Sequence, residues 1–533
     1  RSGLESARCS ENMKHLFRIT YLYLTIPFII FCMGWLRLSV AIPVVAVIVW
    51  ALWQLLKQTL PGQDSKITIH HLLLALLVTG IWLFLSGVGG YAFQNWDHHW
   101  RNAVFRDLVT NNWPVIYSSP ERGPITMLVY YLGDWLPAAL FGRVFGWSIA
   151  NFMLFLWTWL GVLLTVLHLN LKLKTSLVRS ALLLIFFSGL DVVGALLFAK
   201  EYPTLWPPIT HLEIWSGGDL QYSSFTTQLF WVFNQAVPAW LCIVLILGDN
   251  VIARRVLSPT TQSSIHKEIA SGIEQDRPRY DIKFFIWALS FFFAPLASIG
   301  LMPYLMVDFF TQADWRSFFK SIRVDLLFAA GIIFLLSYFF FSSNTAAQER
   351  GFHSLVLKDW LFFFLLDGGI FWLMLAPFKW RDPRWAVTGI LLLVMPFIQL
   401  GNGRDFVMRA SIAPLFYLMM MVGETIFKNT TARGLRFAFY VLLFLGALTP
   451  LYEINRSAVR TYEYYFVLDE TQRAQPNVEP ATHLEKGGAP ELEHPNAILA
   501  DDIYTLTFMQ DKLSKNFIAN VRQSLYYRYL SSR

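Results

Sequence analysis

Runs of about 20 apolar residues recur along the chain, and shorter polar segments separate them. A helix of that length crosses a hydrocarbon core of about 30 Å, whereas a membrane barrel would show short segments of alternating polarity. The pattern therefore predicts an all-α polytopic membrane protein. The apolar runs are 17–36, 38–57, 69–92, 147–169, 179–198, 228–248, 282–311, 324–342, 358–378, 385–400, 411–427 and 435–453.

Two apolar segments do not fit a single straight span. The segment 282–311 is too long for one and contains Pro295 and Pro303, which predicts either a kinked helix or a tight helical hairpin. The segment 125–145 is interrupted by Asp134 and the residues beside it. We expect this second segment to form a helix that lies at the membrane interface or dips into it.

The distribution of lysine and arginine indicates the orientation of the spans. Seven basic clusters lie between the apolar runs, and cytoplasmic loops of membrane proteins carry such an excess. All seven clusters fall on one side if 282–311 is a hairpin and 125–145 does not cross. We therefore expect about thirteen spans in a plasma or inner membrane, with a cytoplasmic N-terminus and an extracytoplasmic C-terminal tail.

The same reasoning divides the chain into consecutive parts. They are a cytoplasmic extension (1–16), an N-terminal transmembrane hairpin (17–68), a core (69–250) with outside loops 93–146 and 199–227, a cytoplasmic loop (251–281), C-terminal transmembrane helices (282–453) and an extracytoplasmic tail (454–533).

Composition agrees with the membrane assignment. The chain is 55% hydrophobic and only 15% charged, whereas a soluble domain has about a quarter of its residues charged. The formal net charge of +7 fits the basic cytoplasmic loops, so it does not point to nucleic acid. The three cysteines show no CxxC spacing, and two of them lie inside apolar runs, which argues against a disulfide or a zinc site.

The first outside loop carries a carboxylate directly after a long span. Asp97 lies among Trp96, His98, His99 and Trp100. A carboxylate held partly dry by aromatic rings can act as a general base toward a hydroxyl. The alternative is that Asp97 only caps a helix, because Asp is a favoured N-cap residue, and both roles can coexist.

Residues 97–109 also show the spacing of a helix with one apolar face, which predicts an interfacial amphipathic helix that includes His98 and Arg101. The adjacent histidines diverge by about 100° on a helix and cannot bind one metal ion together. Interfacial packing is therefore the simpler explanation of both histidines.

The second outside loop is rich in carboxylates, amides and aromatic rings. Such side chains suit a sugar, which has an apolar CH face and a rim of hydroxyls. The alternative is an aromatic belt at the membrane interface, which explains the tryptophans but not the acids. The polar candidates of this loop are Glu201, His211, Glu213, Asp219, Gln221 and Tyr222. Asp191, at the end of the preceding span, must line a cavity or find a partner.

The third polar feature is the segment 401–414, which lies between two spans on the outside. Arg404 and Arg409 oppose the expected charge bias there, and arginine is suited to bidentate contact with phosphate. Asp405 as their internal partner is the alternative. Within the spans, Asp325, Asp367 and Glu424 either hold helices together or belong to an ion path.

This layout resembles the polyprenyl-phosphate-sugar-dependent glycosyltransferases of the GT-C fold, which include the protein mannosyltransferases and the arabinosyltransferases. In that fold the first extracytoplasmic loop bears the essential acidic residue, and Asp97 matches its position. The resemblance covers residues 69–250. The chain departs from the family because the hairpin 17–57 precedes the span that carries Asp97, and because His98 follows Asp97 in place of a second acid.

The resemblance implies transfer of a sugar, with inversion, from a lipid-phosphate donor to a glycan, lipid or protein acceptor outside the membrane. Asp97 would be the general base, and Arg404 and Arg409 would stabilise the departing phosphate. A divalent metal, Mg or Mn, is compatible with the fold, although no DxD motif supports one. The residues expected to bind substrate are His98, Arg101, Asp191, Glu201, His211, Glu213, Asp219, Gln221 and Tyr222.

Three other classes compete with an enzyme of this kind. A transporter or flippase for lipid-linked glycans predicts an internal two-fold repeat and polar residues at the membrane midplane. We find no repeat, and the polar residues gather toward one face. A polymerase or ligase of such glycans would concentrate its arginines in one large late loop. A non-catalytic scaffold remains compatible with the sequence.

Overall fold

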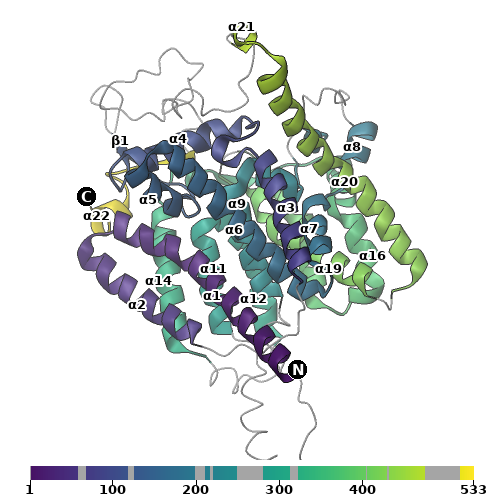
Figure 1. Cartoon of the computed structure of the whole chain (residues 1–533), viewed down its shortest axis with the longest axis horizontal. Coiled ribbons are helices and arrows are strands. Elements are labelled where there is room, and N and C mark those ends of the chain that lie inside the picture. The colour runs from purple at the N-terminus through teal and green to yellow at the C-terminus, as the bar shows by residue number, and fades with distance from the viewer. Residues whose placement is uncertain are drawn as a thin grey trace, which may run out of the picture.

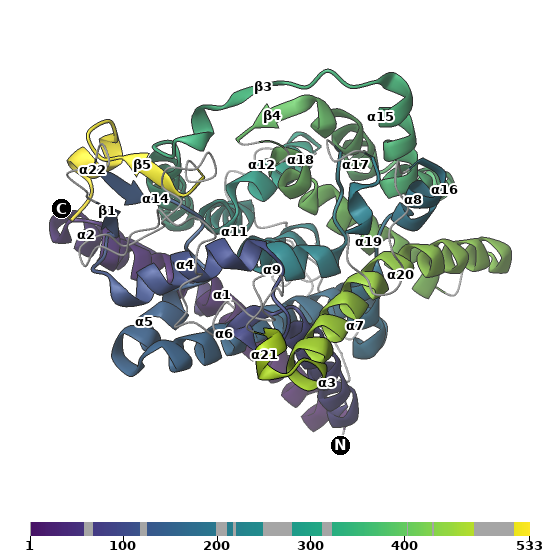
Figure 2. The same ribbon diagram turned by 90° about the horizontal axis from the view of Figure 1, so that it is seen from above.

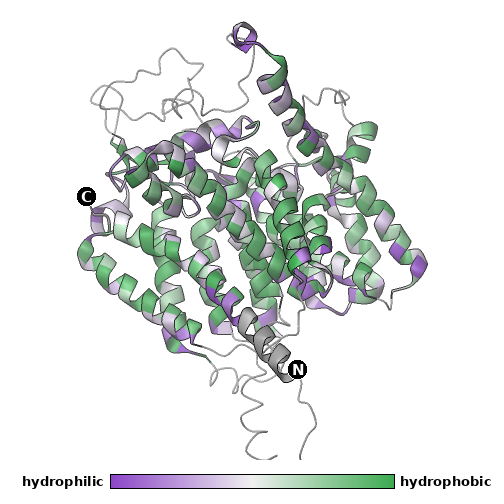
Figure 3. Cartoon of the chain, in the orientation of Figure 1, coloured by the Kyte–Doolittle hydropathy of each residue, from purple (hydrophilic) through white to green (hydrophobic). Residues whose placement is uncertain are grey.

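The computed structural model describes residues 2–57, 68–117, 125–198, 211–216, 220–248, 280–311, 322–401, 403, 405–428, 431–473 and 516–532. Nine helices in these ranges are long and apolar enough to cross a membrane, and Figure 3 shows the apolar residues along them. The protein is thus a helical polytopic membrane protein, as predicted. The count of about thirteen spans stays a prediction. The nine helices are Lys14–Trp35, Leu38–Leu56, Trp147–Leu173, Leu177–Phe198, Phe225–Leu247, Val324–Phe341, Leu357–Lys379, Asp405–Phe427 and Arg433–Val467.

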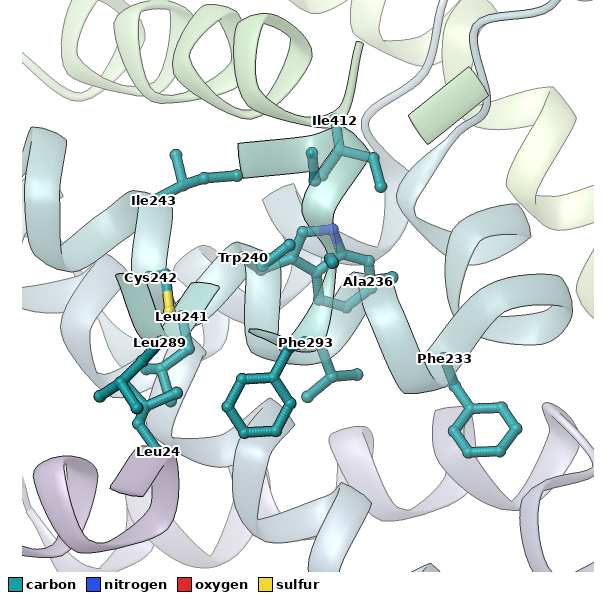
Figure 4. Close-up of a cluster of buried hydrophobic side chains, with 14 of the residues drawn as sticks. Leu24, Phe233, Ala236, Trp240, Leu241, Cys242, Ile243, Leu289, Phe293 and Ile412 are labelled. Carbon is teal, nitrogen blue, oxygen red and sulfur yellow. The ribbon is translucent and has the colours of Figure 1, made fainter. Parts of the chain in front are cut away.

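The N-terminal half builds the centre of the bundle around α9 (Figure 1). Almost all of the α9 side chains are buried. Figure 4 shows Trp240 and Leu241 of α9 with Leu24, Phe293 and Ile412, which come from three other helices. The elements of this half are α1 (Ser2–Trp35), α2 (Leu38–Leu56), α3 (Ile69–Leu85), η1 (Val88–Gly90), α4 (Asp97–Thr110), β1 (Ile116–Tyr117), β2 (Thr126–Leu128), α5 (Leu136–Phe145), α6 (Trp147–Leu173), α7 (Leu177–Phe186), α8 (Asp191–Phe198), η2 (Leu212–Ile214) and α9 (Phe225–Leu247).

The helix α3 ends at Leu85, short of the end of the apolar run 69–92. Gly87 and Gly89 adopt left-handed φ values of 81° and 82°, which glycine reaches without a steric penalty. At Gly87 a Cβ would lie 2.6 Å from the carbonyl oxygen of Phe93, so a larger residue would not fit this turn. The chain therefore leaves the helix early and enters the outer loop before Asp97.

The segment 125–145 is helical only in its second part, α5, so the prediction of one helix over the whole segment was wrong. Its first part forms β2, which pairs antiparallel with β1 on one side and with β5 (Ile518–Asn520) on the other. Asp134 is buried at the turn before α5 and accepts hydrogen bonds from Tyr23 and Thr158 at 3.3 and 3.4 Å. A strand from the far end of the chain and these buried contacts decide the local structure here.

The segment 282–311 is a helical hairpin, which settles the alternative left open by the sequence. The halves α11 (Tyr280–Phe293) and α12 (Pro295–Phe310) meet at Ala294 and pack antiparallel. Ser298 donates to Ser290 at 2.8 Å near the turn. Lys283 and Asp308 form an ion pair of 2.9 Å near the open end. With about 14 to 16 residues, each half is roughly 21 to 24 Å long.

The C-terminal half surrounds α9 and α11 with further helices. Its short strands β3 and β4 pair antiparallel and lie at the upper edge of Figure 2. The elements are α14 (Val324–Phe341), η4 (Ala346–Gln348), β3 (Arg350–Phe352), α15 (Leu357–Phe364), the π-helical turn η5 (Leu365–Gly369), α16 (Ile370–Lys379), α17 (Pro383–Val394), η6 (Met395–Phe397), β4 (Ile398–Leu400), α18 (Asp405–Ala410), α19 (Ile412–Phe427), α20 (Arg433–Tyr462), η7 (Glu463–Val467), α21 (Glu470–Arg473), β5 and α22 (Leu525–Tyr529).

The boundary expected at residue 454 falls inside α20, which continues to Tyr462 because Glu453 and Arg456 are turned into the protein and buried. The last described segment, 516–532, folds back onto the bundle. Its β5 joins β2, and the Arg37 side chain donates to the backbone oxygen of Ser531 at 2.8 Å. The C-terminus accordingly lies beside α2 in both views (Figures 1 and 2).

Two networks of charged side chains, one partly exposed and one mostly buried, join the helix ends at one end of the bundle. Glu424 of α19 pairs with Lys172 of α6 and Lys379 of α16, each at 3.0 Å. Asp308 of α12 pairs with Lys283 at 2.9 Å and with Arg384 of α17 at 2.6 Å. Several of the basic clusters that the sequence places on one side therefore meet here. Glu424 holds helices together, and Asp325 pairs with Arg323 at 2.7 Å.

Asp308 provides a test of this packing. The variant Asp308→Ala leaves Lys283 and Arg384 close together without their shared carboxylate. We expect a loss of about 3–5 kcal/mol in the free energy of unfolding, because removal of one partner strands buried charge. Asp325→Ala removes a half-exposed pair and should cost less than about 1 kcal/mol. Unfolding of the purified protein in detergent measures both, and equal small losses would contradict the assignment.

Candidate functional site

A cavity of about 390 Å³ opens at the end of the bundle opposite the two charge networks. Gln228 of α9 lines the cavity. Leu247, at the other end of α9, accepts a hydrogen bond from Arg384, which belongs to the charge network around Asp308. The helix α9 is kinked at Val232, and the 15 residues from there to Leu247 correspond to roughly 22 Å. Figure 2 views the bundle from above and shows α4, α9 and α18, which carry residues that line the cavity.

Two aspartate–arginine pairs from different helices face this cavity. Asp97 and Arg101 of α4 lie 3.1 Å apart, and Asp405 and Arg409 of α18 form the second pair. Both pairs have the i, i+4 spacing that places two side chains on one helix face. The arginine side chains are at most 9% exposed, whereas that of Asp97 is 31% exposed. The sequence thus brings an accessible carboxylate and two buried cations to one opening.

The start of α4 fixes the position of Asp97. The backbone N–H of Asp97 donates to Oδ1 of Asn95 at 3.2 Å, and Nδ2 of Asn95 donates to the carbonyl oxygen of Phe230 in α9 at 2.6 Å. Asp97 is the first helical residue and its carboxylate binds Arg101, so it is not the N-cap. The capping alternative is therefore wrong, and the carboxylate is directed to the cavity.

A buried network of imidazole and carboxylates forms another wall. His211 lines the cavity, and its Nδ1 lies 2.7 Å from Oε1 of Glu453 in α20. Glu213 lies 3.5 Å from the other ring nitrogen and accepts a hydrogen bond of 3.0 Å from Gln221. Arg456 donates to Glu453 at 2.8 Å. Burial lowers the pKa of His211, but the charges of Glu453 and Glu213 outweigh it and raise this pKa to about 10.

Aromatic rings supply most of the remaining wall. Phe517, from the segment that folds back, stacks on Trp100 with ring centroids 6.0 Å apart and lies 4.6 Å from Tyr130. All three rings line the cavity together with Trp96 and Trp231. Flat rings beside the amides of Gln221, Gln228 and Asn516 present an apolar surface with hydrogen-bonding groups at its edge.

The structure brings five of the sequence candidates together at the cavity. They are Asp97, Arg101, His211, Gln221 and Arg409. Glu201, Asp219 and Arg404 lie outside the described residues, as does the side chain of His99. The positions of these four side chains therefore remain predictions.

Four other candidates do not line the cavity. His98 bonds to the carbonyl oxygen of Phe230 at 2.9 Å and stacks on Phe233. Tyr222 donates to the backbone oxygen of Leu392 at 2.6 Å. The geometry does not support substrate binding by either, because their polar atoms serve helix packing.

Glu213 and Asp191 lie behind the cavity wall. Glu213 accepts the backbone N–H of Ser224 at 2.8 Å, so it positions Gln221 and His211 and does not face the opening. Asp191 is deeper and accepts hydrogen bonds from Ser188 and Thr449. Direct substrate contact by Asp191 was an expectation that this placement does not support.

Sequence reasoning missed several lining residues. Tyr130 and Trp231 lie in segments assigned to an interfacial helix and to a span, where an aromatic ring has an ordinary structural explanation. Asn516 and Phe517 come from the tail, and no local signal in the sequence connects them with Trp100. Glu453 and Arg456 gave one usable signal, since two charges at helical spacing close to the end of an apolar run indicate an inward-facing patch.

A metal site was also tested against the side chains present. Across the described parts of the chain, no group of three or more His, Cys, Asp or Glu side chains could hold a metal ion. The two cavity carboxylates, Asp97 and Asp405, are each paired with an arginine. The chemistry of the site is therefore argued from its charged, amide and aromatic groups.

Comparison of the chain with protein-family models, curated proteins and solved structures gave no match. The function therefore has to be argued from the site itself.

The raised pKa of His211 predicts a pH-dependent contribution to stability. A histidine whose folded pKa is raised from 6.5 to about 10 stabilises the protein fully below about pH 6.5, and this contribution is lost as the pH rises through about 10. The variant His211→Gln should lower the unfolding temperature below pH 6.5 and flatten its decline toward pH 10. Exposed His70 provides the control His70→Gln. An unchanged pH profile in His211→Gln would contradict the assignment.

Proposed function

We propose that this protein is an integral membrane glycosyltransferase that moves a sugar from a lipid-phosphate donor to an extracytoplasmic acceptor. The observation that carries the proposal is the meeting of two Asp–Arg pairs, from α4 and α18, in one cavity of about 390 Å³. That volume lies in the range of ligand sites, about 300–1,000 Å³. In this proposal the carboxylate acts on the acceptor hydroxyl, and the arginines bind the donor phosphate.

The walls of the cavity support a sugar as the transferred group. Trp100, Tyr130, Trp231 and Phe517 offer flat apolar surfaces, against which the CH face of a pyranose can stack. Gln221 and the neighbouring amides can bind hydroxyls as donors and as acceptors. The protonated His211, held by Glu453, adds a fixed cation to the same wall.

Asp97 is the proposed general base. Its ion pair with Arg101 holds the carboxylate in place, and its partial exposure leaves room for an acceptor hydroxyl. The hydroxyl proton moves to Asp97 as the oxygen forms a bond to the anomeric carbon. The bond from that carbon to the phosphate oxygen breaks on the opposite face, so the configuration is inverted. The lipid phosphate leaves with the electron pair of the broken bond.

Arg409 is the proposed phosphate ligand, with Arg404 as a further one. Asp405 holds the Arg409 guanidinium in place, while the Nε of Arg409 has no hydrogen-bond partner among the described residues. A phosphate oxygen is a suitable acceptor for that N–H group. The acceptor can be a glycan, a lipid or a protein.

A transporter or flippase of lipid-linked glycans is the second candidate. Asp367 favours it, because this carboxyl is buried within a membrane-spanning helix and has no basic partner in the part of the chain that the structure describes. A polymerase or ligase of such glycans shares the lipid-phosphate donor and differs in the acceptor. Chemical turnover by the purified protein separates the enzymes from the transporter.

Asp97→Asn tests the base. With purified protein and a panel of polyprenyl-phosphate sugars carrying a labelled sugar, we expect the transfer rate to fall by about 100-fold or more, with little change in donor KM. The amide keeps the size of the side chain but cannot accept the proton.

The matched control for this test is Asp107→Asn. Asp107 is a buried aspartate of the same helix, but it accepts a hydrogen bond of 2.8 Å from Tyr117 and does not line the cavity. Its variant should retain transfer. Wild-type transfer by folded Asp97→Asn would remove Asp97 as the base and the proposal with it.

Arg409→Gln tests the phosphate site. Loss of a charge-assisted contact should raise the donor KM by roughly 10- to 100-fold, and Arg409→Lys should give an intermediate value because it keeps the charge without the planar fork. Arg436→Gln is the control, since Arg436 binds backbone oxygens of Lys428 and Thr431 at the other end of the bundle. An unchanged KM in Arg409→Gln would place the donor phosphate elsewhere.

A further inference from the structure

Two carboxyl groups meet inside the bundle, behind the cavity wall. Asp191 is the first residue of α8 and is fully buried, and Asp367 lies in the π-helical turn η5 and is 2% exposed. The two residues are neighbours where α8 begins beside η5, because a Cβ on Gly189 would lie only 2.6 Å from the Cα of Asp367. The backbone holds them there, because the N–H of Leu190 donates to the oxygen of Leu366 at 2.9 Å.

This meeting point tolerates no extra atom between the backbones. A Cβ on Gly189 would lie 2.6 Å from the Cα of Asp367, and one on Gly446 of α20 would lie 2.6 Å from the backbone oxygen of Ser188. The break between α7 and α8, the turn η5 and α20 are therefore in close contact. Three separate parts of the chain fix the two carboxyls in position.

The hydrogen bonds around the pair leave three oxygens without a donor. Ser188 and Thr449 donate to Oδ2 of Asp191 at 3.1 and 3.2 Å. Oδ1 of Asp191 and both oxygens of Asp367 meet no donor among the described residues. The indole N–H of Trp215 lies near Asp367, but it too makes no hydrogen bond of good geometry there.

The neighbouring charges do not neutralise the pair. The groups that act on Asp367 are Asp191 and Glu213, which are both acidic, and Tyr222 lies beside them. The groups that act on Asp191 are Glu213 and His211, and His211 is already held by Glu453 and Glu213. In contrast, Glu424, Asp308 and Asp325 each contact a lysine or an arginine.

Two ionised carboxylates at this range cannot be stable in a dry interior without a positive charge between them. Asp367 adds a second observation to Asp191, since it comes from another helix, is almost fully buried and has no hydrogen-bond partner for either carboxylate oxygen among the described residues. A divalent ion takes four or more ligands, and the side chains described here form no group of three or more His, Cys, Asp or Glu that could hold one.

We propose that Asp191 and Asp367 bind one monovalent cation, a proton or Na⁺, inside the membrane-embedded part of the protein. The oxygens of Ser188 and Thr449 complete the site. This site does not rest on the proposed glycosyl transfer, because neither aspartate lines the cavity. Its links to the cavity wall are Glu213 and the network around His211.

The Na⁺ arm of the test measures thermal unfolding of the purified full-length protein at constant ionic strength, with Na⁺ exchanged for choline. If Na⁺ is the cation, the unfolding temperature rises with Na⁺ and saturates, by on the order of 2 °C. The variant Asp367→Asn removes this rise. Asp325→Asn, which changes a carboxylate already paired with Arg323, keeps it.

The proton arm uses infrared difference spectroscopy in choline buffer at neutral pH. If the cation is a proton, the wild-type spectrum contains a C=O stretching band of a neutral carboxylic acid that Asp367→Asn lacks and Asp325→Asn keeps, whereas bands of other buried acids such as Asp134 are common to all three proteins. The asparagine amide can donate to Asp191 as a protonated Asp367 does, so we expect this variant to fold.

The Na⁺ arm can be recorded on the wild-type protein alone, and the proton arm compares wild type with Asp367→Asn. If wild type shows no saturable Na⁺ response and its spectrum contains no neutral-acid band that Asp367→Asn lacks, the proposal is overturned. A response that survives unchanged in folded Asp367→Asn also overturns it. Either result leaves the transfer activity of the cavity untouched, so the two proposals fail separately.

Discussion

A carboxylate or a cation taken into the interior of a membrane bundle is costly unless an opposite charge and hydrogen bonds meet it. At one end of this bundle, Glu424 and Asp308 each join two basic side chains from different helices. At the other end, Asp97 and Asp405 each join an arginine on their own helix. The first arrangement ties helices to one another. The second leaves the pairs at the edge of an open cavity, where they can meet a ligand.

The helical layout follows largely from the length of the apolar runs. The runs 228–248, 324–342 and 411–427 correspond within a few residues to α9, α14 and the helix that contains α19. Lipid requires every backbone group of such a run to be satisfied within the helix, so length alone decides the outcome. The segments that differ, 69–92 and 125–145, depend on a glycine turn and on a strand about 390 residues further along the chain, which no local pattern records.

Part of the site could also be predicted from the apolar runs, and part of it could not. Asp97, Arg101, His211, Gln221 and Arg409 are polar residues at the ends of apolar runs, and the alternation of the spans places such ends at one face. His98 and Tyr222 share that origin but are buried. The sequence could not separate the residues that line the cavity from the buried ones, because a helix such as α4 packs against the bundle with one face and borders the cavity with the other. Phe517 was out of reach, since only the folded tail brings it to Trp100.

The Asp–Arg pairs also constrain how the proposed reaction can proceed. A phosphodiester donor carries one negative charge and leaves as a phosphate monoester with one more, while Asp97 loses its charge on taking the proton. The negative charge therefore moves from the α4 pair toward the α18 pair, and the total charge of the cavity stays constant. Arg101 lies where this shift of charge begins, and Arg409 lies where it ends. Because each keeps an Nε–H without a partner among the described residues, a phosphate oxygen can bind without breaking either ion pair. Such a site needs little rearrangement of its charges, which is the condition for electrostatic stabilisation of a transition state in a place with little water.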